Sequence, residues 1–140
     1  MYRVLISLLL ISFGSGFAQT PVGLWRNIDD ETGKPKAEIE IFEENGVLYG
    51  RIVKLLNPSE PNPKCKKCPG EFKDKPIEGL RIMWGLKKTG NEYTGGKILD
   101  PNNGNIYSCK MELVEPNKLK VRGFLGVSLL GRTQYWYRIK

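Results

Sequence analysis

Apolar and polar residues alternate with a period of two along much of the chain, and residues 36–42 show this most clearly. Ala37, Ile39 and Ile41 occupy the odd positions, and glutamates lie between them. Such alternation is typical of a β-strand with one face in a core and the other in solvent. No long segment shows the 3.6-residue period of an amphipathic helix. The pattern therefore predicts an all-β protein.

Residues typical of turns separate these alternating segments. Asn45-Gly46 is a strong hairpin signal because both residues tolerate the left-handed backbone of a tight turn. Asp100–Gly104 contains the Asp, Pro, Asn and Gly of a second turn. About eight strands are predicted, with the bounds Val22–Ile28, Lys36–Phe42, Val47–Leu55, Leu80–Leu86, Glu92–Leu99, Ile106–Val114, Lys118–Phe124 and Arg132–Ile139.

One long segment, Asn57–Pro76, interrupts this pattern between the third and fourth predicted strands. It contains five prolines, five lysines and two cysteines. Proline lacks the N–H group that a strand interior needs, so we predict a loop here. Sequential antiparallel strands of this number close most economically as a small up-and-down barrel, which leaves no exposed sheet edge. A two-sheet sandwich is the alternative.

The first twenty residues have a different composition. Arg3 is followed by the unbroken apolar run Val4–Ile11 and by small residues that end at Ala18. This order is typical of a secretory signal peptide that is cleaved after Ala18. The run is too short to span a bilayer as a helix. We therefore expect an exported mature chain, residues 19–140, that forms one domain in the periplasm or outside the cell.

Composition limits the chemistry of the chain. It contains no histidine, which excludes Ser-His and Cys-His pairs and imidazole metal ligands. The acidic candidates Asp29, Asp30, Glu31 and Asp100 all lie in predicted turns, where such side chains normally support the backbone. None of them has a predicted base beside it. We therefore assign no catalytic residue and no cofactor, and we interpret the chain as a binding protein rather than an enzyme.

Cys65-Lys66-Lys67-Cys68 is the sharpest local motif and has three interpretations. An oxidising compartment favours a local disulfide, which would fix the shape of the loop. The adjacent lysines would lower a thiol pKa and so favour redox activity. A zinc site would use both cysteines and Cys109. Because Cys109 alternates with apolar neighbours, we predict a buried free thiol there, a Cys65–Cys68 disulfide and no metal.

The first and last predicted strands carry the candidate ligand-binding residues. They are Trp25 in Gly23-Leu24-Trp25, and Arg132, Gln134, Trp136 and Arg138 on one face of the last strand. In a closed barrel these strands are neighbours, so an arginine could stack on Trp25 and close one end. This arrangement resembles the Gly-x-Trp signature of lipocalin-like barrels. Mixed aromatic and polar groups suit a cavity that orients a small, partly apolar ligand, and they equally suit a filled aromatic core.

Two loops could act through their surfaces. The lysines of Lys64–Lys75, partly offset by Glu71 and Asp74, could contact an anionic component of the cell envelope, or could be a solvated loop. The formal net charge of +7, or +6 without Arg3, agrees with either interpretation, and export argues against nucleic acid as a partner. Gly126–Gly131 is an apolar segment flanked by glycines, which could cover the barrel mouth as a lid or fill it as a plug.

The order and spacing of several short stretches resemble the bacterial family catalogued as domain of unknown function 2147. The stretches are Gly23-Leu24-Trp25, Gly33-Lys34-Pro35, Leu48–Val53, Gly95–Pro101, Gly104 with Tyr107, Leu119–Gly123 and Gly131–Trp136. The resemblance covers Gly23–Ile139. It implies a small exported β domain that is lipocalin- or calycin-like in general form, and it brings no catalytic residues.

Two functions follow as expectations. The first is an exported, non-catalytic module for a small apolar or amphipathic ligand, bound by the five candidate residues. The alternative is a redox-active or structural envelope protein that acts through the Cys65–Cys68 loop or through the basic loop surface.

Overall fold

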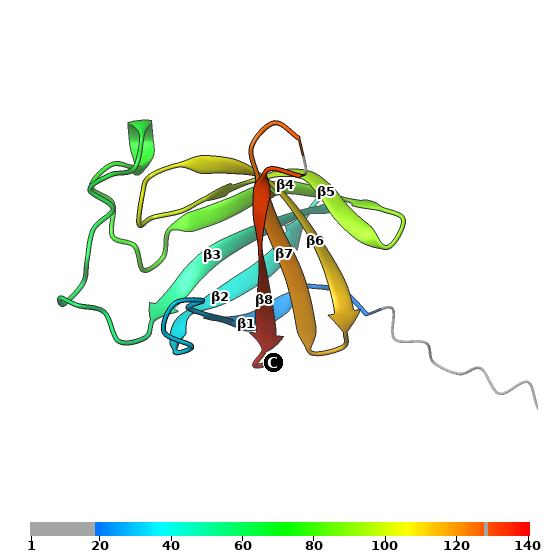
Figure 1. Cartoon of the computed structure of the whole chain (residues 1–140), viewed down its shortest axis with the longest axis horizontal. Coiled ribbons are helices and arrows are strands. Elements are labelled where there is room, and N and C mark those ends of the chain that lie inside the picture. The colour runs from blue at the N-terminus through cyan, green and yellow to red at the C-terminus, as the bar shows by residue number, and fades with distance from the viewer. Residues whose placement is uncertain (1–18, 128) are drawn as a thin grey trace, which may run out of the picture.

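The computed structural model describes residues 19–127 and 129–140, so the signal peptide expected at residues 1–18 lies outside the described residues. Eight strands follow one another along the described chain (Figure 1). They are β1 (Gly23–Ile28), β2 (Pro35–Glu44), β3 (Val47–Leu55), β4 (Arg81–Thr89), β5 (Glu92–Leu99), β6 (Ile106–Glu115), β7 (Lys118–Phe124) and β8 (Gly131–Arg138). A short 3₁₀ helix, η1 (Gly70–Phe72), lies between β3 and β4. No helix within residues 19–127 or 129–140 is long and apolar enough to cross a membrane.

The strands form one closed antiparallel barrel whose order in space is the order in sequence. Each strand pairs with the next, and β8 pairs with β1 to close the ring. The strands β3, β5 and β7 begin and end where the alternation predicts. The up-and-down barrel predicted from sequence is confirmed, and the two-sheet alternative is wrong.

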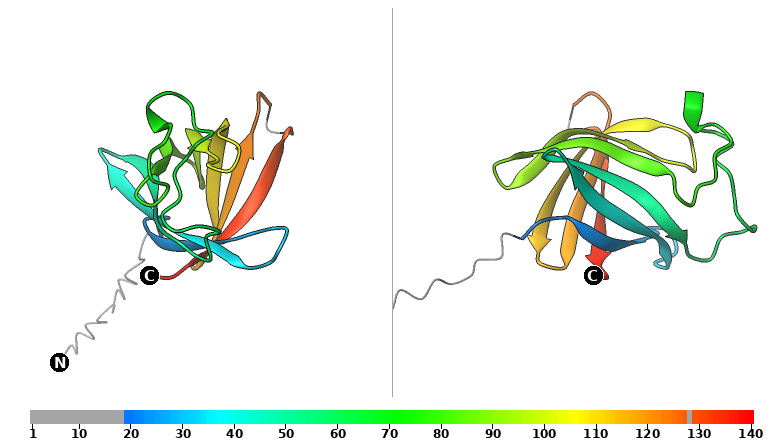
Figure 2. Two further views of the ribbon diagram at one scale, coloured as in Figure 1. Left: turned by 90° about the vertical axis from the view of Figure 1, so that its left-hand side faces the viewer. Right: turned by 180° about the vertical axis from the view of Figure 1, so that it is seen from behind.

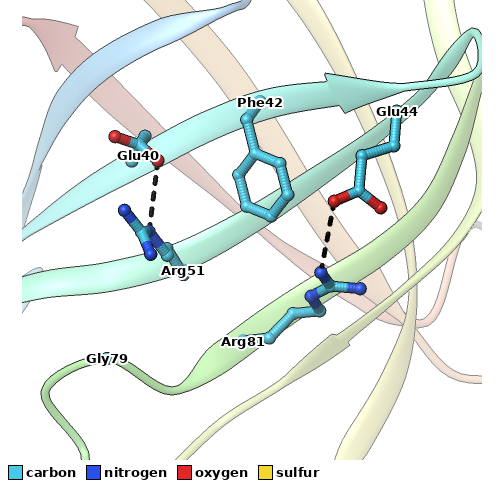
Figure 3. Close-up of a pocket in the computed structure, with 6 residues that line it drawn as sticks. All are labelled: Glu40, Phe42, Glu44, Arg51, Gly79 and Arg81. Atoms are coloured by element: carbon cyan, nitrogen blue, oxygen red, sulfur yellow. Dashed lines mark hydrogen bonds and ion pairs between the residues drawn. The ribbon is translucent and has the colours of Figure 1, made fainter.

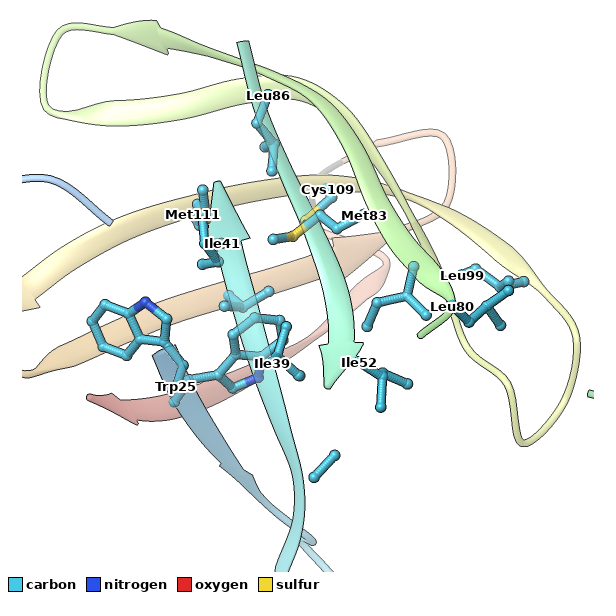
Figure 4. Close-up of a cluster of buried hydrophobic side chains, with 14 of the residues drawn as sticks. Trp25, Ile39, Ile41, Ile52, Leu80, Met83, Leu86, Leu99, Cys109 and Met111 are labelled. Carbon is cyan, nitrogen blue, oxygen red and sulfur yellow. The ribbon is translucent and has the colours of Figure 1, made fainter. Parts of the chain in front are cut away.

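Apolar side chains on the inward-facing positions fill the barrel (Figure 4). Ala37, Ile39 and Ile41 are at most 3% exposed, as their spacing predicts. Trp25 of β1 and Trp136 of β8 are the largest buried side chains. Burying each large side chain of this kind contributes roughly 1.5–3 kcal/mol, which makes this cluster the main stabilising element. Its other members from the strands include Leu48, Ile52, Met83, Leu86, Cys109, Met111, Leu119 and Val121.

The connections divide between the two ends of the barrel (Figure 2). Those between β1 and β2, β3 and β4, β5 and β6, and β7 and β8 lie at one end, which we call the mouth. The three hairpin turns between the remaining pairs lie at the other end, together with the segment before β1 and the C-terminal Lys140. We call this the closed end.

The long segment between β3 and β4 is folded against the barrel. The amide of Cys65 donates to the carbonyl of Lys75 at 2.8 Å, and the amide of Ile77 donates to Pro63 at 3.0 Å, so the two arms of the loop pair with each other. The ring of Phe72 in η1 stacks on Trp84 of β4, with 5.8 Å between ring centroids. The loop predicted from its prolines is therefore real, and tertiary contacts fix its position.

Candidate functional site

The closed end is built around Arg138 and Trp25. The guanidinium of Arg138 lies 4.4 Å from the centroid of the Trp25 ring, which confirms the predicted stacking of an arginine on this tryptophan. The same guanidinium donates hydrogen bonds to the carbonyl oxygens of Thr20, Val22 and Pro116, at 2.7, 2.9 and 3.0 Å. The guanidinium thereby joins β8 to the segment before β1 and to the turn between β6 and β7, across the end of the barrel.

The surroundings of these two residues leave them little freedom. Trp25 is 0% exposed, and its indole N–H donates to the carbonyl of Pro21 at 2.7 Å. Burial lowers the pKa of Arg138, because the charged guanidinium has lost part of its hydration. Both residues are thus engaged in closing the barrel, and neither offers a polar group to a ligand in this arrangement.

Deeper in the barrel, the interior is apolar. Trp136 is 1% exposed and lies opposite Leu119, and its indole N–H donates to the side-chain oxygen of Gln134 at 3.4 Å. The Cys109 thiol lies 3.9 Å from the Met83 sulfur. Burial raises the pKa of this thiol to about 12, so it stays protonated at neutral pH. The predicted buried, free Cys109 is confirmed.

Toward the mouth, β8 loses its partner on one side. The pairing of β1 with β8 covers Trp25–Asn27 against Trp136–Arg138, and within the described chain it does not continue toward the mouth beyond Asn27 and Trp136. Residues Gly131–Tyr135 therefore pair with β7 alone, and we call them the open edge. The candidates Arg132 and Gln134 lie on this edge, whereas Trp25 and Arg138 lie at the closed end and Trp136 lies between them. The structure thus separates the five predicted ligand-binding residues into two groups.

A side-chain ion pair spans the open edge. Arg132 donates from Nε to the Asp30 carboxylate at 2.7 Å, and its Nη2 donates to the same oxygen. These hydrogen bonds are the main reason that the pKa of Arg132 is raised, and Asp100 and Glu31 add to the effect. We call this pair the latch. It joins residues 102 positions apart, so no local sequence signal could have shown it.

Two other acidic candidates, Asp29 and Asp100, support the backbone, as predicted. The Asp29 carboxylate accepts the amide of Glu31 at 2.8 Å, and that hydrogen bond is the largest cause of its lowered pKa. The Asp100 carboxylate accepts the amide of Asn102 at 2.9 Å. Each of these hydrogen bonds joins residues two positions apart within a turn. No group of three acidic or cysteine side chains placed to hold a metal ion occurs in the described part of the chain.

The inner wall beside the latch has little side-chain volume. Cross-strand register aligns Cys109, Gly123 and Arg132 in one row, so the central position of the row has no side chain. A Cβ added to Gly123 would lie 3.6 Å from both Ile98 and Tyr107, which is ordinary van der Waals contact. A methyl group would therefore fit at this position.

The disulfide loop forms another wall of the mouth end. Cys65 and Cys68 form the predicted disulfide and are 0% and 3% exposed. The Cys65 sulfur lies 3.6 Å from the carbonyl oxygen of Pro101, in the turn between β5 and β6. In the same turn, Gly104 has a φ of +75°, and a Cβ there would overlap the carbonyl of Lys67. Both cysteine sulfurs belong to this disulfide.

A hollow lies on the outside of the barrel over β2, β3 and β4 and was not predicted (Figure 3). Its volume is about 390 Å³. Arg81 lies over the Tyr49 ring at 4.6 Å and pairs with Glu44 at 3.7 Å, while Arg51 pairs with Glu40 at 3.1 Å. The outward positions of the alternating strands could have indicated this cluster. Each arginine already has a carboxylate partner, so the hollow offers no excess of charge to a ligand.

The apolar segment between β7 and β8 points into solvent. Leu129 is 89% exposed and Leu130 is 66% exposed, and Leu125 and Val127 are also more than half exposed. A plug would be buried in the barrel, so the plug interpretation is wrong. Ser128 lies outside the described residues.

Comparisons with known proteins agree with this architecture. A family model described as "Uncharacterized protein conserved in bacteria (DUF2147)" matches residues 23–138. A search of curated proteins found no match. Among solved structures, protein HP1028 from the human pathogen Helicobacter pylori, which belongs to the lipocalin family, is similar with a TM-score of 0.74. The two chains are 21% identical, and the match covers 85% of this chain and 82% of that one. At this identity the similarity shows a shared fold.

Proposed function

Since the chain belongs to the bacterial DUF2147 family, whose description names no activity, we propose its function from the barrel mouth. We infer that it is an exported, non-catalytic module that binds one small, partly apolar ligand beside the open edge of β8. Eight-stranded barrels are either filled by side chains or hold one small ligand. Side chains fill the core of this barrel, so we propose that the ligand binds at the mouth, and the lipocalin-like fold supports such a role.

The observation that carries this proposal is the change in β8 along its length. Its second half pairs with β1 around buried Trp136, while its first half has no partner on that side. Strand positions without a partner expose backbone N–H and C=O groups. Arg132 and Gln134 add side-chain donors and an acceptor at the same place. The mouth therefore combines unpaired polar groups with the apolar wall formed by Ile98 and Tyr107.

The five candidate residues take different roles in this proposal. Arg132 and Gln134 would bind the polar part of the ligand. Trp136 would hold Gln134 in place through the indole hydrogen bond. Trp25 and Arg138 would keep the closed end rigid, since all of their polar contacts are with the backbone.

The electrostatics of the mouth favour a neutral polar group over a multiply charged anion. Arg132 is already neutralised by Asp30, and Glu31 and Asp100 are close enough to raise its pKa. An anionic head would meet these carboxylates at the same time as the guanidinium. A hydroxyl, amide or ester group can accept from Arg132 or Gln134 without that repulsion.

The test is a native mass spectrum of the mature protein, exported into a periplasm and purified without reductant. We expect an additional mass that disappears on denaturation. Gly123→Leu, which adds a large side chain to the inner wall beside the latch, should lose it. Gly123→Ala is the matched control, because a Cβ fits there, and it should keep the additional mass.

Uptake of a neutral, partly apolar fluorescent probe such as N-phenyl-1-naphthylamine gives a second readout. Binding by the wild type that Gly123→Leu abolishes supports a site at the mouth. Absence of both an additional mass and probe binding in the wild type would contradict the proposal. Equal binding by wild type and Gly123→Leu would place the ligand elsewhere.

A further inference from the structure

Four exposed apolar side chains lie together on the loop between β7 and β8, at the mouth end. They are Leu125, Val127, Leu129 and Leu130, exposed by 57%, 60%, 89% and 66%. The loop has internal hydrogen bonds: the amide of Leu125 donates to the carbonyl of Leu130 at 2.9 Å, and the amide of Leu130 donates to Val127 at 3.0 Å. We call these four side chains the apolar tip. Exposed apolar groups gathered in this way mark interaction surfaces.

Cations occupy the outer face of the strands that lead to the apolar tip. In one row of outward-facing side chains, cross-strand register aligns Lys97 of β5 with Ser108 of β6. In the next such row, further from the tip, it aligns Lys110 of β6 with Arg122 of β7. The first carboxylate on β6, Glu112, lies one row further from the tip, opposite Lys120. The two outward rows nearest the tip on β5, β6 and β7 thus contain three cations and no carboxylate.

The tip and the cations form one continuous surface. A hollow on the outside of the barrel is lined by Leu129 of the tip, by the cations Lys110, Lys120 and Arg122, and by the carboxylates Glu92 and Glu112. Arg122 also donates to the Thr133 hydroxyl at 2.9 Å, which holds its guanidinium along the sheet. Leu129 therefore projects next to the basic side chains.

We propose that this surface docks the barrel, mouth first, onto an anionic lipid bilayer. Leucine side chains at the tip can enter the boundary between headgroups and acyl chains, while lysine and arginine stay at the level of the lipid phosphates. Anionic lipids attract such cations near the surface. Charge complementarity selects the anionic bilayer over an uncharged apolar partner, and the formal net charge without Arg3, +6, has the same sign.

Docking of this kind would bring the open edge of β8 next to the membrane, because Gly131 directly follows Leu130. A partly apolar ligand could then pass between the bilayer and the mouth with little exposure to water. The docking itself does not depend on the ligand, so the two proposals can be tested separately.

The experiment is flotation of the full mature protein with vesicles of phosphatidylethanolamine and phosphatidylglycerol, and with vesicles of phosphatidylcholine alone. We expect binding to the anionic vesicles that weakens at high salt, and weak binding to phosphatidylcholine. Leu129→Ser with Leu130→Ser should lower the partition coefficient at least about tenfold, because two large apolar groups are lost from the tip. Lys97→Gln with Lys110→Gln should also lower it and should reduce its dependence on salt.

Val53→Ser with Val114→Ser is the matched control. These valines are 42% and 43% exposed; Val53 lies on β3 and Val114 lies at the closed-end terminus of β6, so their loss should leave vesicle binding unchanged. Failure of the wild type to bind anionic vesicles would overturn the proposal, and so would an equal loss in the control. Self-association in sedimentation velocity that disappears in the leucine variant, without vesicle binding, would assign the tip to a second copy of the chain. In every variant, ligand binding is measured separately, by the additional mass in native mass spectra or by binding of the neutral probe.

Discussion

Arg138 and Arg132 lie on the same strand and on the same face, yet they do different things. Arg138 stacks on a buried tryptophan and binds three backbone carbonyls, so the closed end depends on it. Arg132 is 61% exposed and binds one carboxylate on a loop. The difference arises because β1 pairs with β8 at one end only. Where β8 pairs with β1, Arg138 is part of the framework of the barrel. Where β8 lacks that partner, Arg132 is left available for binding.

The largest effect is expected at the closed end. Trp25→Ala removes a fully buried ring, the partner of Arg138 and a hydrogen bond to Pro21. We expect a loss of about 3–5 kcal/mol in the free energy of unfolding, measured by urea denaturation. A loss below about 1 kcal/mol would mean that the closed end does not hold the barrel together.

Gly104→Ala comes next and probes the packing of the disulfide loop against the mouth end. Gly104 has a φ of +75°, and the added methyl would overlap the Lys67 carbonyl. We expect a loss of about 2–3 kcal/mol. Gly90→Ala is the control: its φ is +63° and nothing lies within 4 Å of the added Cβ, so only the cost of the backbone conformation, about 1 kcal/mol, applies. Equal losses would show that the loop is not fixed by this turn.

Reduction of the Cys65–Cys68 disulfide should have a moderate effect on stability and none on binding. The bond closes a ring of four residues, so the loop-closure model gives about 2 kcal/mol. Thermal unfolding with and without reductant measures this loss, and native mass spectrometry under the same conditions measures ligand retention. Loss of the ligand on reduction at unchanged stability would instead favour a function centred on the cysteines.

The smallest effect on stability is expected at the latch. Asp30→Asn removes one member of an exposed ion pair. Because solvent screens such a pair, we expect its loss to lower the free energy of unfolding by only about 0.5 kcal/mol. Ligand exchange should become faster, because the open edge is no longer spanned, and stopped-flow displacement of the neutral probe measures the rate. Unchanged exchange would mean that the ligand does not pass the latch.

The sequence predicts the framework well because its determinants are local. Alternation such as that of Ala37, Ile39 and Ile41 defines a strand and its buried face, and Asn45-Gly46 defines the hairpin that follows. The stacking of an arginine of the last strand on Trp25 was also predictable, since a closed barrel makes its first and last strands neighbours, but only the structure identifies that arginine as Arg138. The disulfide followed from two cysteines three residues apart.

The mouth could not be predicted in the same way. The point at which β1 and β8 separate depends on the register of the whole barrel, and the latch joins residues 102 positions apart. Alternation assigns Arg132 and Arg138 to one face without showing that they lie at opposite ends of the barrel. The apolar tip has no period that gives its direction, so only the structure shows that Leu129 points into solvent.

The central claim is that the closed end supports the barrel and the mouth binds the ligand. The most direct measurement compares Arg132→Gln with Arg138→Gln in two readouts, the free energy of unfolding and the ligand retained in native mass spectra. We expect Arg132→Gln to lose the ligand at nearly unchanged stability, and Arg138→Gln to lose stability while its folded fraction keeps the ligand. Loss of the ligand from Arg138→Gln at unchanged stability, with full retention by Arg132→Gln, would contradict the account.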